Sequence, residues 1–171
     1  MILIHTALFP EAKPIIEYLK LKFIQKKPYK IYKSENIILI VTGMGEKTLL
    51  IKEVLSKYHI KRAINIGIAG CKDKTIPIGT LFCTNQQLKN IPYSTITTVT
   101  NPLDNSDDLN TLLVDMETKY FLETTKNIKE VYVFKIVSDY LNTTIPNKRF
   151  VWEIIEKNLN KLDYYLKSPI L

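Results

Sequence analysis

Four short segments of the chain are almost entirely apolar, and they do most to limit the folds that the sequence can adopt. They are residues 2–4, 37–41, 63–68 and 131–137. Continuous apolar runs of this length are typical of strands buried on both faces. The first two runs are followed by apolar residues at helical spacing, such as Ile15, Ile16 and Leu19. The pattern predicts an α/β fold with three layers, in which helices cover both faces of a mixed central sheet.

The remaining elements are expected from weaker signals. We predict one domain over residues 1–171, because a chain of this length suits a single core. The first helix is expected to begin at Pro10 and to extend to Phe23, and three further helices are expected at 49–58, 112–125 and 150–166. Further strands are expected at 29–34, 78–82 and 94–100, and loops at 101–110 and 142–146.

Composition excludes several classes of function. The net charge is +7, but the lysines are scattered and no basic stripe is interleaved with aromatic residues, so we expect no nucleic-acid partner. No run approaches the ~20 apolar residues that span a bilayer, and the start has no basic region typical of a signal peptide. Two cysteines and two distant histidines give neither a disulfide framework nor a zinc motif. We therefore expect a cytoplasmic protein without metal, cofactor or membrane partner.

Polar and small residues follow the predicted strands, where ligands bind in open α/β sheets. Such positions are 7–11, 43–45, 67–70, 116–117 and 138–139. Each has a simpler explanation: the glycines suit tight turns, the acids at 115 and 117 suit a helix N-terminus, and Ser-Asp suits a helix cap or an Asx turn. Taken singly, these motifs leave both interpretations open.

Taken together and in order, the motifs resemble the purine and uridine phosphorylase superfamily. The similarity is greatest to its nucleosidase branch, the methylthioadenosine/S-adenosylhomocysteine nucleosidases and futalosine hydrolases. The matching segments cover most of the chain and are 7–11 (ALFPE), 41–46 (VTGMGE), 65–70 (NIGIAG), 78–80 (IGT), 114–117 (VDME) and 133–139 (VFKIVSD).

The resemblance implies a dissociative cleavage of the N-glycosidic bond of a purine-type nucleoside. Asp139 would protonate the leaving base at N7 and Glu11 would activate the attacking water. These two roles need an acid and a base whose pKa values are separated by their surroundings. Glu117 would bind the ribose hydroxyls. The resemblance places five further residues in substrate binding: Met44, Ala69, Gly70, Met116 and Ser138.

Three features of the sequence depart from the family pattern. No arginine lies near a matched motif, which favours hydrolysis over phosphorolysis, and Lys135 replaces the arginine of the last motif. Thr80 stands where the family has aspartate. The stretch between Thr80 and Met116 is shorter than in the family, so a second subunit could complete the base pocket. We expect a homodimer, the commonest assembly of soluble oligomers. A phosphorylase, a catalytically weak nucleoside-binding paralogue and a basic nucleic-acid-binding domain are the alternatives.

Overall fold

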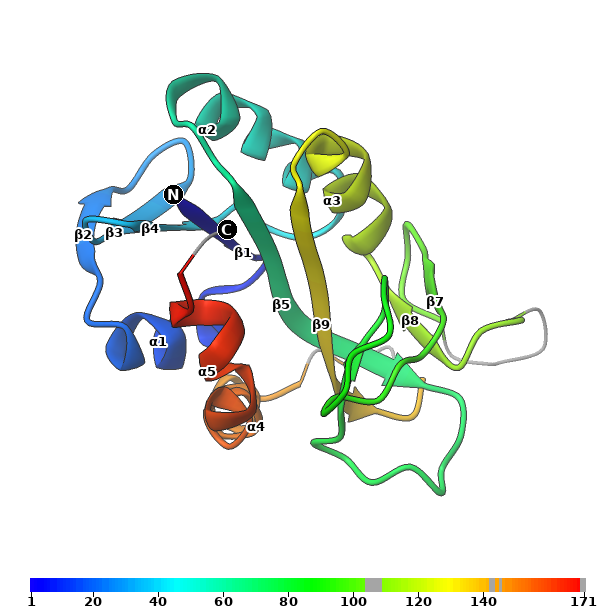
Figure 1. The fold of residues 1–171 in the computed structure, drawn as a ribbon. Coiled ribbons are helices and arrows are strands. Elements are labelled where there is room, and N and C mark those ends of the chain that lie inside the picture. The colour runs from blue at the N-terminus through cyan, green and yellow to red at the C-terminus, as the bar shows by residue number, and fades with distance from the viewer. Residues whose placement is uncertain (104–108, 142–143, 145, 170–171) are drawn as a thin grey trace.

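A computed structural model describes residues 1–103, 109–141, 144 and 146–169 (Figure 1). Its strands are β1 (Ile2–Thr6), β2 (Lys22–Gln25), β3 (Lys30–Lys33), β4 (Ile37–Val41), β5 (Arg62–Cys71), β6 (Leu81–Cys83), β7 (Ile96–Thr98), β8 (Leu113–Asp115) and β9 (Glu130–Asp139). Its helices are α1 (Phe9–Tyr18), the 3-10 helix η1 (Gly45–Leu50), α2 (Ile51–Lys57), α3 (Thr118–Thr125), α4 (Lys148–Glu156) and α5 (Leu159–Lys167). None of these helices is long and apolar enough to cross a membrane.

The strands form one mixed sheet. Its order is β2-β3-β4-β1-β5-β8-β7, and β9 pairs with both β5 and β6. The four apolar segments of the sequence form β1, β4, β5 and β9, and these strands run parallel to their neighbours within the group. Their carboxyl ends therefore lie at the same edge of the sheet, where the predicted site residues follow them.

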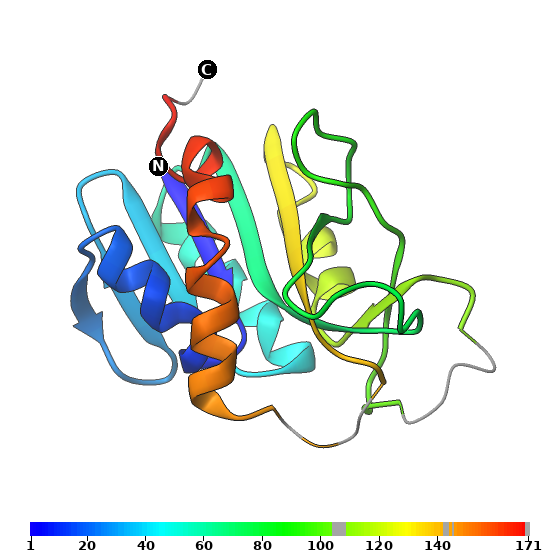
Figure 2. The same ribbon diagram turned by 90° about the horizontal axis from the view of Figure 1, so that it is seen from below.

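Helices cover both faces of this sheet, which confirms the predicted three-layer α/β fold. Helices α1, α4 and α5 lie on one face and η1, α2 and α3 on the other (Figures 1 and 2). The first face is packed with side chains such as Ile15, Ile155 and Leu162, and the second with Ile51, Val54 and Phe121. Because β5 lies between these two clusters, both its faces are buried, as its apolar sequence predicts.

Three predicted helix boundaries are wrong. The first helix ends at Tyr18 rather than Phe23, because Lys20 takes a positive φ of 52° and the chain continues into edge strand β2. Residues 112–125 do not form one helix. Their first part is β8, which pairs with both β5 and β7 and gains ladder hydrogen bonds that helical spacing does not reveal.

The terminal helix is divided into α4 and α5 near Asn158. The Nδ2 atom of Asn158 donates hydrogen bonds to the carbonyl oxygens of Gly79 (3.0 Å) and Ile154 (2.9 Å). An asparagine side chain that bonds to the backbone in this way competes with a continuous helix. The predicted loops at 101–110 and 142–146 lie partly outside the described residues.

Candidate active site

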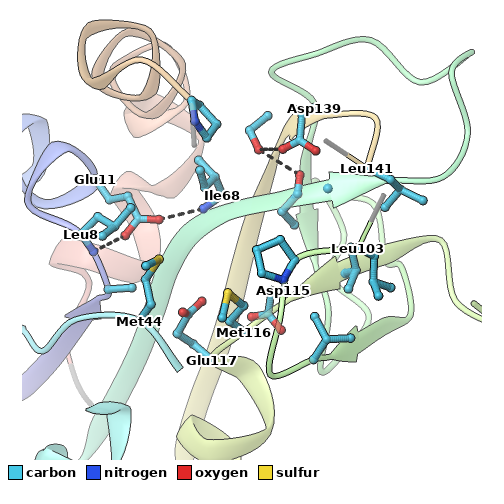
Figure 3. A pocket seen from close by; sticks show the side chains of 18 of the residues that line it. Leu8, Glu11, Met44, Ile68, Leu103, Asp115, Met116, Glu117, Asp139 and Leu141 are labelled. Carbon is cyan, nitrogen blue, oxygen red and sulfur yellow. Dashed lines mark hydrogen bonds between the residues drawn. The ribbon is translucent and has the colours of Figure 1, made fainter. Parts of the chain in front are cut away.

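A pocket opens at the carboxyl edge of the parallel strands, and the fold brings every predicted site residue to its wall (Figure 3). These residues come from the loop and first turn of α1, the turn after β4, the end of β5, the β8–α3 connection and the end of β9. They are Glu11, Met44, Ala69, Gly70, Met116, Glu117, Ser138 and Asp139. Their convergence follows from topology, since parallel strands deliver their carboxyl ends to one crevice.

Glu11 is held in the first turn of α1 by two backbone amides. Its Oε2 accepts from the Leu8 N–H at 2.8 Å and its Oε1 accepts from the Ile68 N–H at 3.1 Å (Figure 3). Burial, reinforced by the nearby Glu117, raises the pKa of Glu11 to about 7, against the opposing effects of the two amides and Lys135. A carboxyl group with this pKa can accept a proton at neutral pH.

Glu117 lies between β8 and α3 and is the N-cap residue of α3, so the acids of this motif do stand at a helix N-terminus as well as at the pocket. Its Oε1 accepts a hydrogen bond from the Gly45 N–H at 3.0 Å, and its Oε2 lies 3.9 Å from Lys135 Nζ. Burial raises its pKa, with Asp115 adding to that effect and Lys135 opposing it. The carboxylate is thus fixed from two sides at the pocket wall.

Sequence reasoning did not place Asp115 and Lys135 in the site, although both belong to matched motifs. Lys135 Nζ lies 2.8 Å from Asp115 Oδ2, and both side chains are almost completely buried. Burial alone would raise the pKa of Asp115, but the Lys135 ammonium and hydrogen bonds from Thr118 and Thr98 hold it below its ordinary value. The two groups form a buried ion pair, of which Asp115 lines the pocket and Lys135 does not.

Gly67 makes room for this arrangement. It pairs with Lys135 across β5 and β9. A Cβ atom at Gly67 would lie 3.0 Å from Glu11 Oε1 and 3.3 Å from Lys135 Nζ. A side chain there would press on the acid and the cation together, which explains why the strand carries glycine at this point.

Asp139 ends β9 on the opposite side of the pocket from Glu117 (Figure 3). The Ser138 hydroxyl donates to Asp139 Oδ2 at 2.6 Å and also lies 3.3 Å from the Ala69 carbonyl oxygen. This short hydrogen bond fixes the orientation of the carboxyl group. Helix α4 begins only at Lys148, so Asp139 does not cap a helix, and the helix-cap explanation of the Ser-Asp motif is wrong.

Apart from the hydroxyls of Ser138 and Thr144, the rest of the described wall is apolar and carries no cation. The charged side chains among the described lining residues are all acids: Glu11, Asp115, Glu117 and Asp139. Apolar side chains fill the space between them, and Met44 is 43% exposed at the mouth. Some of them lie outside the matched motifs, and the sequence gives no signal that they meet; these are Val99, Pro102, Leu103, Leu141 and Pro146.

Comparison with solved structures shows where this fold occurs. It is similar to futalosine hydrolase of Helicobacter pylori (TM-score 0.80, 13% identity, 95% of this chain and 96% of that chain covered). It is similar to the 5'-methylthioadenosine/S-adenosylhomocysteine nucleosidase of S. pneumoniae, solved with the transition-state inhibitor MT-ImmA (TM-score 0.80, 16% identity, 98% of each chain covered). It is also similar to the Chlamydia trachomatis MTAN bound to MTA (TM-score 0.74, 19% identity, 97% of this chain and 98% of that chain covered).

These similarities establish the fold. The chain has the nucleoside phosphorylase-like architecture that the ordered motifs predict. No protein-family model matches the sequence, and no curated protein does so.

Proposed function

We propose that the protein is a nucleosidase, which hydrolyses the N-glycosidic bond of a purine-type nucleoside such as methylthioadenosine, S-adenosylhomocysteine or a futalosine-like compound. The observation that carries the proposal is the convergence of Glu11, Glu117 and Asp139 from three separate elements on one largely apolar pocket. A protein that only binds nucleosides has no need of three acids there.

Asp139 is assigned to the leaving base. The carboxyl group protonates the purine at N7, so that the base departs as a neutral molecule. Ser138 supports this role, because its 2.6 Å hydrogen bond holds the carboxyl group in one orientation. A well-placed general acid contributes roughly 10²–10⁴ in rate.

Glu11 and Glu117 are assigned to water and sugar. Glu11 takes a proton from the attacking water, and its raised pKa of about 7 suits a general base at neutral pH. Glu117 accepts hydrogen bonds from the ribose hydroxyls, with Met116 packing against the sugar. Met44 at the mouth, together with Ala69 and Gly70 at the end of β5, completes the substrate contacts.

Hydrolysis is favoured over phosphorolysis by the absence of cations. No Lys, Arg or His lines the pocket in the described part of the chain. The sequence itself has none between Asn90 and Thr118 or between Ile136 and Asn147, the segments that supply much of the wall. Phosphate sites are normally built with such side chains or with amides at a helix N-terminus.

The test is a panel of purine nucleosides incubated with and without phosphate, with the released base and sugar identified. We expect free base and free sugar at a rate independent of phosphate. A sugar 1-phosphate whose formation requires phosphate would show a phosphorylase instead. Tight binding of a nucleoside without turnover would show the binding paralogue.

We further propose that the protein acts in the cytoplasm as a homodimer of single-domain subunits, with the pocket near the interface. Exposed apolar side chains support the dimer, among them Met44 at the pocket mouth, Ile78 and Tyr93. Closed symmetric dimers are the commonest way to cover such surface. Light scattering at micromolar concentration should give twice the monomer mass, and the monomer mass would exclude this assembly.

A further inference from the structure

His5 lies in a buried hydrogen-bond chain that ends at the glycine turn after β4. The imidazole is fully buried and does not line the pocket. Its Nδ1 lies 2.8 Å from Asn65 Nδ2, and its Nε2 lies 2.8 Å from Thr42 Oγ1. The Thr42 hydroxyl in turn donates to the Gly43 carbonyl oxygen at 3.0 Å. The chain therefore crosses from β5 through β1 to the turn that follows β4.

The hydrogen bonds of this chain all donate in one direction, from Asn65 towards Gly43. An amide nitrogen can only donate, so His5 Nδ1 accepts from Asn65. The neutral ring then carries its proton on Nε2 and donates to Thr42, which leaves the single hydroxyl proton of Thr42 for Gly43. Burial lowers the pKa of His5 to about 3, with the Lys135 charge adding to this and Asp115 opposing it. The ring is consequently neutral at the pH of the cytoplasm, and the direction is kept.

The glycine turn at the end of this hydrogen-bond chain also binds the side chain of Glu117. Gly43 and Gly45 have positive φ values of 102° and 66°, which glycine adopts readily and other residues rarely. The Gly43 N–H donates to the Ala7 carbonyl oxygen at 3.0 Å, and the Gly45 N–H donates to Glu117 Oε1 at 3.0 Å. The orientation of the Gly43 carbonyl therefore affects where the Gly45 amide points, and with it the position of the Glu117 carboxylate.

His5 reaches Glu117 by a second route. Its ring stacks on Phe121 of α3, with centroids 5.8 Å apart and planes 18° from parallel. The Phe121 N–H donates to the Glu117 carbonyl oxygen at 3.0 Å, within the first turn of that helix. One buried ring thus contacts both structures that fix Glu117, the glycine turn and the start of α3.

We propose that His5 is a positioning residue for Glu117, acting through Thr42 and the turn of Gly43 and Gly45. Its effect on substrate rests on the proposed function, in which Glu117 binds the ribose hydroxyls. Its effect on the turn does not, because the hydrogen bonds are present in the protein alone.

Thr42→Val is the most direct test, because it keeps the shape of the side chain and removes the hydroxyl that joins His5 to Gly43. Thr42→Ser restores a hydroxyl and is the rescue variant. Thr48→Val is the matched control. Thr48 is also buried, in the adjacent η1, and its hydroxyl has no hydrogen-bond partner among the described residues. His5→Phe keeps a ring to stack on Phe121 and removes both of the imidazole's hydrogen bonds.

The first measurement is hydrogen exchange of the Gly45 amide in the ligand-free protein. We expect exchange about 10-fold faster in Thr42→Val and His5→Phe, with no change in Thr48→Val. The proposal would be overturned by unchanged exchange of the Gly45 amide in Thr42→Val and His5→Phe, or by an equal acceleration of that exchange in Thr48→Val. This measurement decides the positioning role even if the wild-type protein cleaves no nucleoside, a result that would refute only the proposed function.

The second measurement compares kcat/KM for adenosine and 2',3'-dideoxyadenosine. For adenosine we expect a fall of roughly 3- to 10-fold in Thr42→Val, the effect of losing about one hydrogen bond, and recovery in Thr42→Ser. The dideoxy compound lacks the hydroxyls assigned to Glu117. For this compound, kcat/KM of Thr42→Val and of the wild type should differ by less than about 2-fold. An equal fall for both compounds would show general damage and contradict the proposal.

Discussion

Replacing Lys135 with methionine should be among the most destabilising single changes in the chain. Methionine fills much of the same space but leaves the carboxylate of Asp115 buried without its cation, which lies 2.8 Å away in the native protein. Removing one partner of a buried pair costs about 3–5 kcal/mol. Asp115 would keep its hydrogen bonds from Thr118 and Thr98, so we expect a loss near the lower end, about 3 kcal/mol. In urea unfolding this corresponds to a midpoint lowered by roughly 1–2 M.

Lys167→Met provides the matched control. Lys167 Nζ lies 2.7 Å from Asp163 Oδ1, nearly the distance of the buried pair, but both side chains are about half exposed (47% and 45%). An exposed pair contributes about 0–1 kcal/mol, so the same substitution should have little effect there. Adding Asp115→Asn to Lys135→Met should recover part of the loss, because the buried group is then neutral. Equal, small losses in both lysine variants would refute the reasoning that burial decides the outcome.

The loss in Lys135→Met should also depend on pH. The native pKa of Asp115 lies below its ordinary value. A group of this kind contributes stability above its unfolded pKa of about 4, and that contribution is lost as the pH falls through the folded pKa. The difference between variant and wild type should therefore narrow in acid. A difference that stays constant from pH 7 to pH 3 would show that packing, rather than charge, causes the loss.

Three further predictions concern activity. Asp139→Asn should lower kcat by about 100-fold or more with a nearly unchanged melting temperature, and full activity with a lowered melting temperature would remove the proposed acid. Because the base must be ionised and the pKa of Glu11 is raised to about 7, kcat/KM should rise with pH and reach half its maximum near pH 7; a flat profile between pH 5 and 8 would exclude Glu11 as the base. Adenosine 5'-monophosphate should be cleaved at least about 100-fold more slowly than adenosine, because the charged groups of the described pocket wall are all acids, and comparable rates would contradict this.

The fold could be predicted from the sequence because its central strands are apolar on both faces. Ile38 and Ile64 pack against the helical layers, and their burial does not depend on the structure of the loops. The apolar pattern of the sequence therefore predicts the three layers correctly. Parallel strands then bring their carboxyl ends together without further information. This is why residues as distant as Glu11 and Asp139 could be placed in one pocket from sequence order alone.

The parts that could not be predicted depend on contacts between distant residues. Strand β8 forms because Val114 pairs with Gly70 of β5, a contact that local spacing does not show. The Lys135–Asp115 pair joins two motifs without any sequence sign that they meet, and the link from His5 to Thr42 joins residues 37 positions apart. Sequence patterns report periodicity and local turns, whereas these contacts are set by the register of the sheet.

The charges around the pocket form a coherent arrangement under the proposed function. Asp115, Glu117 and Glu11 lie around the buried cation Lys135, so the floor is short of positive charge. Burial raises the pKa values of Glu11 and Glu117, and a neighbouring carboxylate adds to that effect in each case. This excess of carboxylate repels phosphate and anionic substituents. It also favours positive charge on the sugar, which develops as the bond to the base breaks ahead of attack by water. Fixed groups aimed at charge that develops in the transition state are a principal source of catalysis. The same excess of acid therefore accounts for both the expected rejection of phosphate and the expected stabilisation of the ribosyl cation.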